Sequence, residues 1–155
     1  MSAGRTLGAR TLSEGLGTAM LVAVVVGSGV MAQRLSDDVG VQLLANSTAT
    51  SLALAALILT FGPVSGAHLN PAVTLAEHVT GKLERRAVVP YLLAQLVGGC
   101  IGAVVANLMF ELPAVEWSST DRIAAGTALA EVVATFGLLT VIFGVVRSGR
   151  PTAVP

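Results

Sequence analysis

Charged residues are scarce in this sequence, and so are aromatic residues and cysteines. Charged side chains make up 12% of the 155 residues and aromatic side chains 4%, whereas an ordinary soluble domain is about 25% charged. The net charge is zero and the basic residues are scattered, which argues against a nucleic-acid-binding surface. A single cysteine, Cys100, excludes a disulfide framework within the chain. Hydrophobic residues are abundant instead, at 54% with a mean hydropathy of +0.80, and this composition predicts an integral membrane protein.

Four apolar stretches are long enough to cross a bilayer core, which takes about 20 residues. They cover residues 12–32, 41–62, 88–110 and 123–146. Between the second and the third stretch, residues 63–86 contain only a short apolar part, 71–79, which is too short to cross. We therefore expect an all-α membrane protein with four spans, in which 71–79 forms a re-entrant half-helix that leaves the membrane on the side it entered.

The basic residues predict the orientation of these spans, because Lys and Arg concentrate in cytoplasmic loops. Seven of the nine fall on one side of a four-span topology: Arg5, Arg10, Lys82, Arg85, Arg86, Arg147 and Arg150. The other two are Arg34 and Arg122. Both termini are therefore expected to be cytoplasmic in a multi-pass protein of the cell membrane.

The segment SGAHLNPAVTL, residues 65–75, places polar and helix-incompatible residues beside an apolar run. Asn70 is a favourable helix cap, and Pro71 suits the first helical position because its fixed backbone angle is helical and its missing N–H would have no partner there. Gly66 allows the backbone to enter in an extended form. A short helix is therefore expected to begin at Pro71, with its positive dipole end toward the membrane interior.

The backbone before that helix offers a row of carbonyl acceptors at residues 65–68. The side chain of Asn70 either folds back as a cap or points into a cavity, where its NH2 group is a donor. Acceptors along an approach and donors at its end suit a small, neutral, hydrogen-bonding solute, and a positive dipole end opposes cations and protons.

Two glutamates lie within predicted spans and need hydrogen-bond partners there. Glu14 lies in SEGLGTAMLV and Glu131 in AEVVATFGLL, and each is followed by a threonine four residues later. This similarity predicts an internal repeat, inverted in topology if the first span runs outward and the fourth inward. We expect Glu131 to be an organiser rather than a proton carrier, accepting hydrogen bonds from unpaired backbone amides of residues 65–70.

The motifs together resemble the aquaporin and glycerol-facilitator family, the major intrinsic proteins. The similar segments are SGAHLNPAVT, EGLGT, AEVVATF and YLLAQLVGGCIGA. The resemblance implies an aquaporin-like right-handed bundle, assembly as a tetramer, and passive flow of water or small neutral solutes without a cofactor, a metal or a catalytic residue. It assigns pore-lining positions to Gly66, Ala67, His68, Asn70, Pro71 and Ala72, and structural roles as loop braces to Glu14 and Glu131.

The resemblance divides the chain into a first repeat, residues 1–112, and the start of a second, residues 113–155. The family's second Asn-Pro-Ala and filter arginine follow a fifth span and do not occur in these 155 residues. We therefore expect either a truncated gene product or a pore completed by another chain. A fragment or partner subunit that conducts nothing by itself is the alternative.

Selectivity is indicated at Thr50, where water-selective members of the family place an aromatic residue. A small hydroxyl there predicts a wider and more polar constriction, or simply a packing residue. The overall sequence resembles bacterial members encoded beside arsenic-resistance genes, which implies glycerol or undissociated metalloid hydroxides as solutes.

An intramembrane hydrolase or metalloenzyme is a different class of function for the same polar residues. It would use Ser65, His68, Glu77 and His78. The spacing disfavours it, because the two histidines are ten residues apart with no third strong ligand at zinc spacing and no base within a turn of a nucleophile.

Overall fold

The computed structural model describes residues 5–116 and 124–148, and these residues form α-helices joined by short loops. The helices are α1 (Leu7–Leu35), α2 (Val39–Ser65), α3 (Pro71–Val79), α4 (Arg85–Met109) and α5 (Ala125–Arg147). Four of them, all except α3, are long and apolar enough to cross a membrane. The four expected spans are thus confirmed, although the expected start of the fourth at residue 123 lies outside the described residues.

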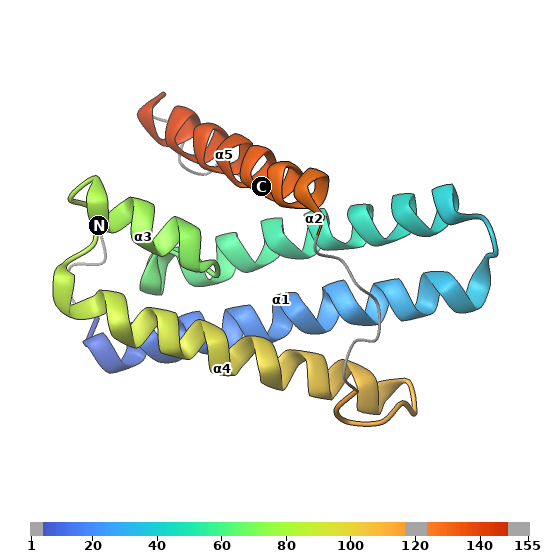
Figure 1. Ribbon diagram of the computed structural model, residues 1–155. Helices are drawn as coiled ribbons and strands as arrows, with labels where there is room; N and C mark the ends of the chain where they lie inside the picture. The colour runs from blue at the N-terminus through green and yellow to red at the C-terminus, as the bar shows by residue number, and fades with distance from the viewer. Residues whose placement is uncertain (1–4, 117–123, 149–155) are drawn as a thin grey trace. The chain divides into compact units, whose positions relative to one another are not determined.

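The described chain separates into two compact units that divide after Val115. In the first unit, α1 packs against both α2 and α4, and α3 packs against α4. Figure 1 shows α1, α2 and α4 running alongside one another, with α3 between the end of α2 and the start of α4. The described part of the second unit is essentially α5, and none of the α5 side chains that the structure describes is buried.

Small residues bring α1 and α4 into close contact. A Cβ atom added to Gly98 would overlap the carbonyl oxygen of Gly15, and one added to Gly102 would overlap that of Ala19. Small residues at such a spacing let helix backbones approach in lipid, where packing must replace the hydrophobic driving force. This close crossing holds α1 and α4 together, and side chains of both helices support the loop between α2 and α3.

The second helix ends later than expected. Pro63 was expected to begin the loop, but α2 continues through it to Ser65 and ends at Gly66, whose left-handed backbone (φ +96°) forms the cap. The N–H of Gly66 bonds to the carbonyl of Gly62, so the last turn stays closed beyond the proline. The extra turn carries the hydroxyl of Ser65 to the functional site.

Candidate functional site: the loop before the half-helix

The loop between α2 and α3 has an unusual backbone. Gly66, Ala67 and Leu69 all have positive φ, at 96°, 47° and 48°. Only glycine adopts this region without a steric cost, so Ala67 and Leu69 require support from the surrounding structure. Both of these side chains are buried and pack with Leu57.

Glu14 on α1 supplies the main support for the loop. Its side chain is fully buried, and its carboxylate accepts four hydrogen bonds, two on each oxygen. The donors are Ser65 Oγ (2.6 Å), His68 N (3.0 Å), Leu69 N (2.7 Å) and Gln95 Nε2 (2.9 Å). Successive backbone N–H groups that converge in this way form an anion-binding nest, and the anion here is a side chain of the same protein.

The amide positions fix where the loop carbonyls point. In a planar trans peptide the C=O lies opposite the N–H. Because the N–H groups of His68 and Leu69 point at Glu14, the carbonyls of Ala67 and His68 point away from it. Among the described residues, no donor reaches these two carbonyls or that of Gly66. The loop therefore presents unused acceptors on the side remote from Glu14.

A second hydrogen-bond chain connects the loop to the basic end of the helices. The hydroxyl of Tyr91, a fully buried residue of α4, donates to the Ser65 carbonyl at 2.8 Å and accepts from Arg10 Nε at 3.0 Å. Arg10 in turn bonds to Glu84 through Nη1 at 2.7 Å. Glu84 also accepts a hydrogen bond from Arg86. The contact with Arg86, and to a smaller extent that with Arg10, holds the pKa of the Glu84 carboxyl below its usual range.

Gln95 and Thr74 connect α4, α3 and the loop. Gln95 Nε2 bonds to Thr74 Oγ1 (2.9 Å) as well as to Glu14, and Thr74 Oγ1 lies 3.2 Å from His68 Nδ1. Tyr91, Gln95 and Thr74 were not singled out as site residues from the sequence. A signal existed, because Tyr91 and Gln95 are polar residues one turn apart inside an apolar span.

Asn70 takes the capping role, one of the two that the sequence left open. Its Oδ1 accepts from the N–H of Ala72 at 2.8 Å and so caps α3. Its Nδ2 has no hydrogen-bond partner among the described residues and is left as a donor at the start of the half-helix. Pro71 occupies the first helical position, as expected.

Thr50 lies apart from this constellation, and Glu131 belongs to the second unit. Thr50 is on α2, 15 residues before its end, which at about 1.5 Å per residue is about 22 Å along the helix. Its Oγ1 is enclosed and has no hydrogen-bond partner within residues 5–116 and 124–148. Glu131 is exposed on α5. The expectation of unpaired amides for Glu131 is wrong at His68 and Leu69, because both already donate to Glu14.

The residues of the alternative enzymatic site are not assembled into one. Ser65 donates to Glu14, while His78 Nδ1 lies 3.0 Å from the Leu83 carbonyl and Glu77 pairs with Lys82. Within the part of the chain that the structure describes, no group of three or more His, Cys, Asp or Glu side chains could hold a metal ion.

Four long apolar helices, a short helix between two of them and a buried carboxylate holding the loop define a helical, multi-pass membrane protein. The major intrinsic protein family model matches residues 4–153, and the chain belongs to this family.

Similar proteins from bacteria, archaea and plants support the family assignment. Aquaglyceroporin AqpS of Rhizobium meliloti (strain 1021) is 44% identical over 94% of this chain and 62% of its own length. The probable aquaporin AqpM of Archaeoglobus fulgidus is 33% identical over 94% of this chain and 68% of its own. Aquaporin NIP1-2 of Arabidopsis thaliana is 29% identical over 91% of this chain and 50% of its own length. The chain thus spans between half and about two thirds of the length of these relatives.

Proposed function

We propose that this chain forms part of the wall of a pore for passive movement of water or small neutral solutes, with glycerol and undissociated metalloid hydroxides as candidates. One observation carries the proposal: the carbonyls of Ala67 and His68 point away from Glu14 and are unused. A solute with hydroxyl groups can exchange its hydration for such acceptors one after another. The name of AqpS, an aquaglyceroporin, supports a solute of this kind.

The half-helix supplies the complementary donors. The Nδ2 group of Asn70 and the free N–H groups at the start of α3 lie at the end of the carbonyl row, and the positive end of the helix dipole lies there too. A positive dipole end disfavours cations and protons while leaving neutral solutes unaffected. In this proposal Gly66, Ala67 and His68 line the approach, and Asn70, Pro71 and Ala72 form its inner end.

The remaining assignments belong to the same proposal. Thr50 contributes a wide, polar constriction, and Glu131 braces a second loop as Glu14 braces the first. Residues 1–112 form a first repeat and residues 113–155 the start of a second. The chain works without catalysis, as a tetramer in the cell membrane, and chemical cross-linking in membranes tests for that tetramer.

A permeability assay tests transport. Vesicles are prepared with the 155-residue chain alone, and with the chain plus a polypeptide supplying the part of AqpS that the alignment leaves uncovered. We expect no added permeability from the chain alone, because a pore needs walls on all sides and one repeat supplies about half of them. The combined chains are expected to raise water and glycerol permeability in stopped-flow light scattering.

Asn70→Asp is the matched variant, because it keeps the capping oxygen but removes the NH2 donor and adds a negative charge. It should lower solute flux at least tenfold, whereas Asn107→Asp, outside the loop, should not. If neither preparation conducts while the helices remain folded, the chain is a non-conducting subunit and the transport proposal fails. Conduction by the chain alone would instead favour a homo-oligomeric pore.

The topology has its own test. Both termini and residues 82–86 are proposed to be cytoplasmic, with residues 36–40 outside. Single cysteines introduced in a Cys100→Ala background are exposed to an impermeant thiol reagent in intact cells. Cysteine at position 38 should react and cysteine at position 84 should not; the opposite pattern reverses the orientation, and labelling of both contradicts a re-entrant α3.

A further inference from the structure

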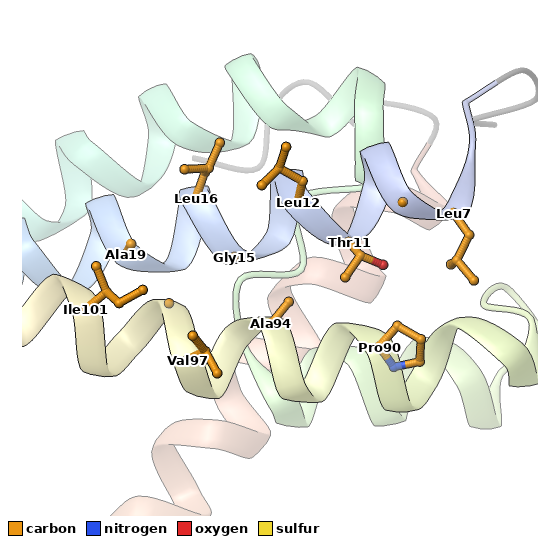
Figure 2. Close-up of a pocket in the computed structure, with 12 residues that line it drawn as sticks. Leu7, Thr11, Leu12, Gly15, Leu16, Ala19, Pro90, Ala94, Val97 and Ile101 are labelled. Carbon is orange, nitrogen blue, oxygen red and sulfur yellow. The ribbon is translucent and has the colours of Figure 1, made fainter.

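A groove runs along the outer surface of the α1–α4 pair, separate from the loop site. It encloses about 660 Å³ and begins at Leu7 and Pro90. Figure 2 shows apolar side chains of both helices along its walls, down to Ala19 and Ile101. None of the groups that hold the loop lies among its lining residues. The groove is therefore separate from the surface that the proposed pore uses.

The length of the groove corresponds to one leaflet of a bilayer. Leu7 and Ala19 are twelve residues apart on α1, which at about 1.5 Å per residue is about 18 Å. Half of a hydrocarbon core of about 30 Å is about 15 Å. An extended acyl chain from one leaflet thus fits the groove from end to end.

The end of the groove at Leu7 is basic. Arg86 lies one helical turn before Pro90 on α4, with a side chain that is 76% exposed, and Arg85 is adjacent to it. Arg5 lies two residues before α1 begins and is exposed. Glu84 is the acidic residue among them, and it is already shared between Arg86 and Arg10. Arg5 and Arg85 have no ion-pair partner in the described part of the chain, so the groove mouth carries excess positive charge.

One polar side chain lies just inside that mouth. Thr11 is one turn beyond Leu7 on the groove wall, and Figure 2 shows its hydroxyl oxygen between the two helices. This oxygen is enclosed and has no hydrogen-bond partner among the residues described. An enclosed hydroxyl without a partner is unfavourable. Rotation of the Thr11 side chain about χ1 would let this hydroxyl donate to a carbonyl group of a molecule bound in the groove.

From the apolar walls, the basic mouth and the unpaired Thr11 hydroxyl, we propose that the α1–α4 groove is a binding site for one anionic phospholipid. The arginines at the mouth face the phosphate, Thr11 donates to an ester carbonyl, and the apolar walls cover an acyl chain. Basic clusters beside grooves between membrane helices are suited to anionic headgroups. A zwitterionic lipid matches the apolar walls equally well but gains less from the excess charge.

Competition between two lipids tests the proposal. The purified chain in detergent is incubated with equal amounts of dioleoyl phosphatidylglycerol and dioleoyl phosphatidylcholine, and bound lipid is counted by native mass spectrometry. We expect at least a fivefold preference for phosphatidylglycerol. Arg5→Gln combined with Arg86→Gln should reduce that preference to below twofold, whereas Arg147→Gln on α5 should leave it unchanged. Equal binding of both lipids by the unmodified chain would indicate ordinary boundary lipid and overturn the proposal.

A substitution that fills the groove locates the site. A Cβ at Gly8 meets no atom within 4 Å, so Gly8→Leu fits the fold while occupying the mouth. It should lower phosphatidylglycerol retention at least fivefold. Gly62→Leu on α2 also enters open space and is the control. The isosteric Thr11→Val should lower retention about twofold with helicity unchanged by circular dichroism. Unchanged retention in both groove variants, or loss of a dimer instead of lipid, would overturn the proposal; the latter would assign the groove to a second copy.

Discussion

Glu14 and Glu131 occupy similar stretches of sequence and very different surroundings. Each lies in an apolar helix with a threonine four residues later. Glu14 is fully buried and accepts four hydrogen bonds from three other segments, whereas Glu131 is exposed on α5 and accepts none from the described residues. A carboxylate in an apolar helix is therefore not a structural element by itself. It becomes one when another segment supplies the donors.

The largest difference between the two regions should appear when each carboxylate is removed. Glu14→Leu leaves the amides of His68 and Leu69 without an acceptor, at about 1–3 kcal/mol for each stranded donor, and removes one of the two acceptors of Gln95 Nε2. Glu131→Leu is the matched variant, and in the 155-residue chain measured alone it should change stability by less than about 0.5 kcal/mol, as exposed substitutions do. Thermal unfolding in detergent, followed by circular dichroism, measures both. Equal losses of stability in the two variants would contradict the different structural roles of Glu14 and Glu131.

Glycine substitutions sharpen the comparison, because they should have opposite signs in the two regions. Gly98→Ala forces the α1 and α4 backbones apart at Gly15, and overpacking of this kind costs about 1–3 kcal/mol. Gly137→Ala on α5 meets no atom within 4 Å and should stabilise its helix by up to about 1 kcal/mol through higher helix propensity. The same unfolding assay applies, and destabilisation of similar size at both positions would contradict the close-packed crossing.

Hydroxyl removal compares long-range with local hydrogen bonds. Tyr91→Phe deprives the Ser65 carbonyl and Arg10 of a partner and should cost about 0.5–1.5 kcal/mol. Among the residues that the structure describes, the hydroxyl of Thr140 bonds to the Phe136 carbonyl in its own helix alone, so Thr140→Val should be nearly neutral. Hydrogen exchange of the loop amides provides a second measurement: faster exchange at His68 and Leu69 is expected in the Tyr91 variant alone.

The smallest effect is expected from the exposed ion pairs at the start of α4. Arg86, and then Arg10, lowers the pKa of Glu84 in the folded protein. The stabilising contribution is therefore present above the unfolded pKa of about 4.3 and is lost as the pH falls through the lower folded value. Glu84→Gln should lower the unfolding temperature slightly at pH 7, and this effect should shrink as the pH falls through the folded pKa of Glu84. Glu131→Gln is the control, and a difference between wild type and Glu84→Gln that grew in acid would contradict the assigned pairs.

Much of the fold follows from local sequence properties. The spans were recognisable because about 20 apolar residues suffice for a crossing regardless of their neighbours. The bounds of α3 agree with the expected residues 71–79, because Asn70 and Pro71 specify a helix start through their own backbone preferences. The end of α2 was less predictable: Pro63 favours a break, but the closed last turn and the Ser65–Glu14 hydrogen bond favour a continued helix.

By itself the sequence determined which segments are helical and apolar, where the half-helix begins and which polar residues lie within spans, since these depend on composition and on neighbours a few residues away. Only the tertiary structure decided which carboxylate holds the loop, because His68 and Leu69 are more than fifty residues from Glu14 along the chain. It also decided that the loop amides face Glu14 and the carbonyls face away. That orientation depends on positive φ at Ala67 and Leu69, a conformation that their own side chains disfavour and that the contacts with α1 and α2 maintain.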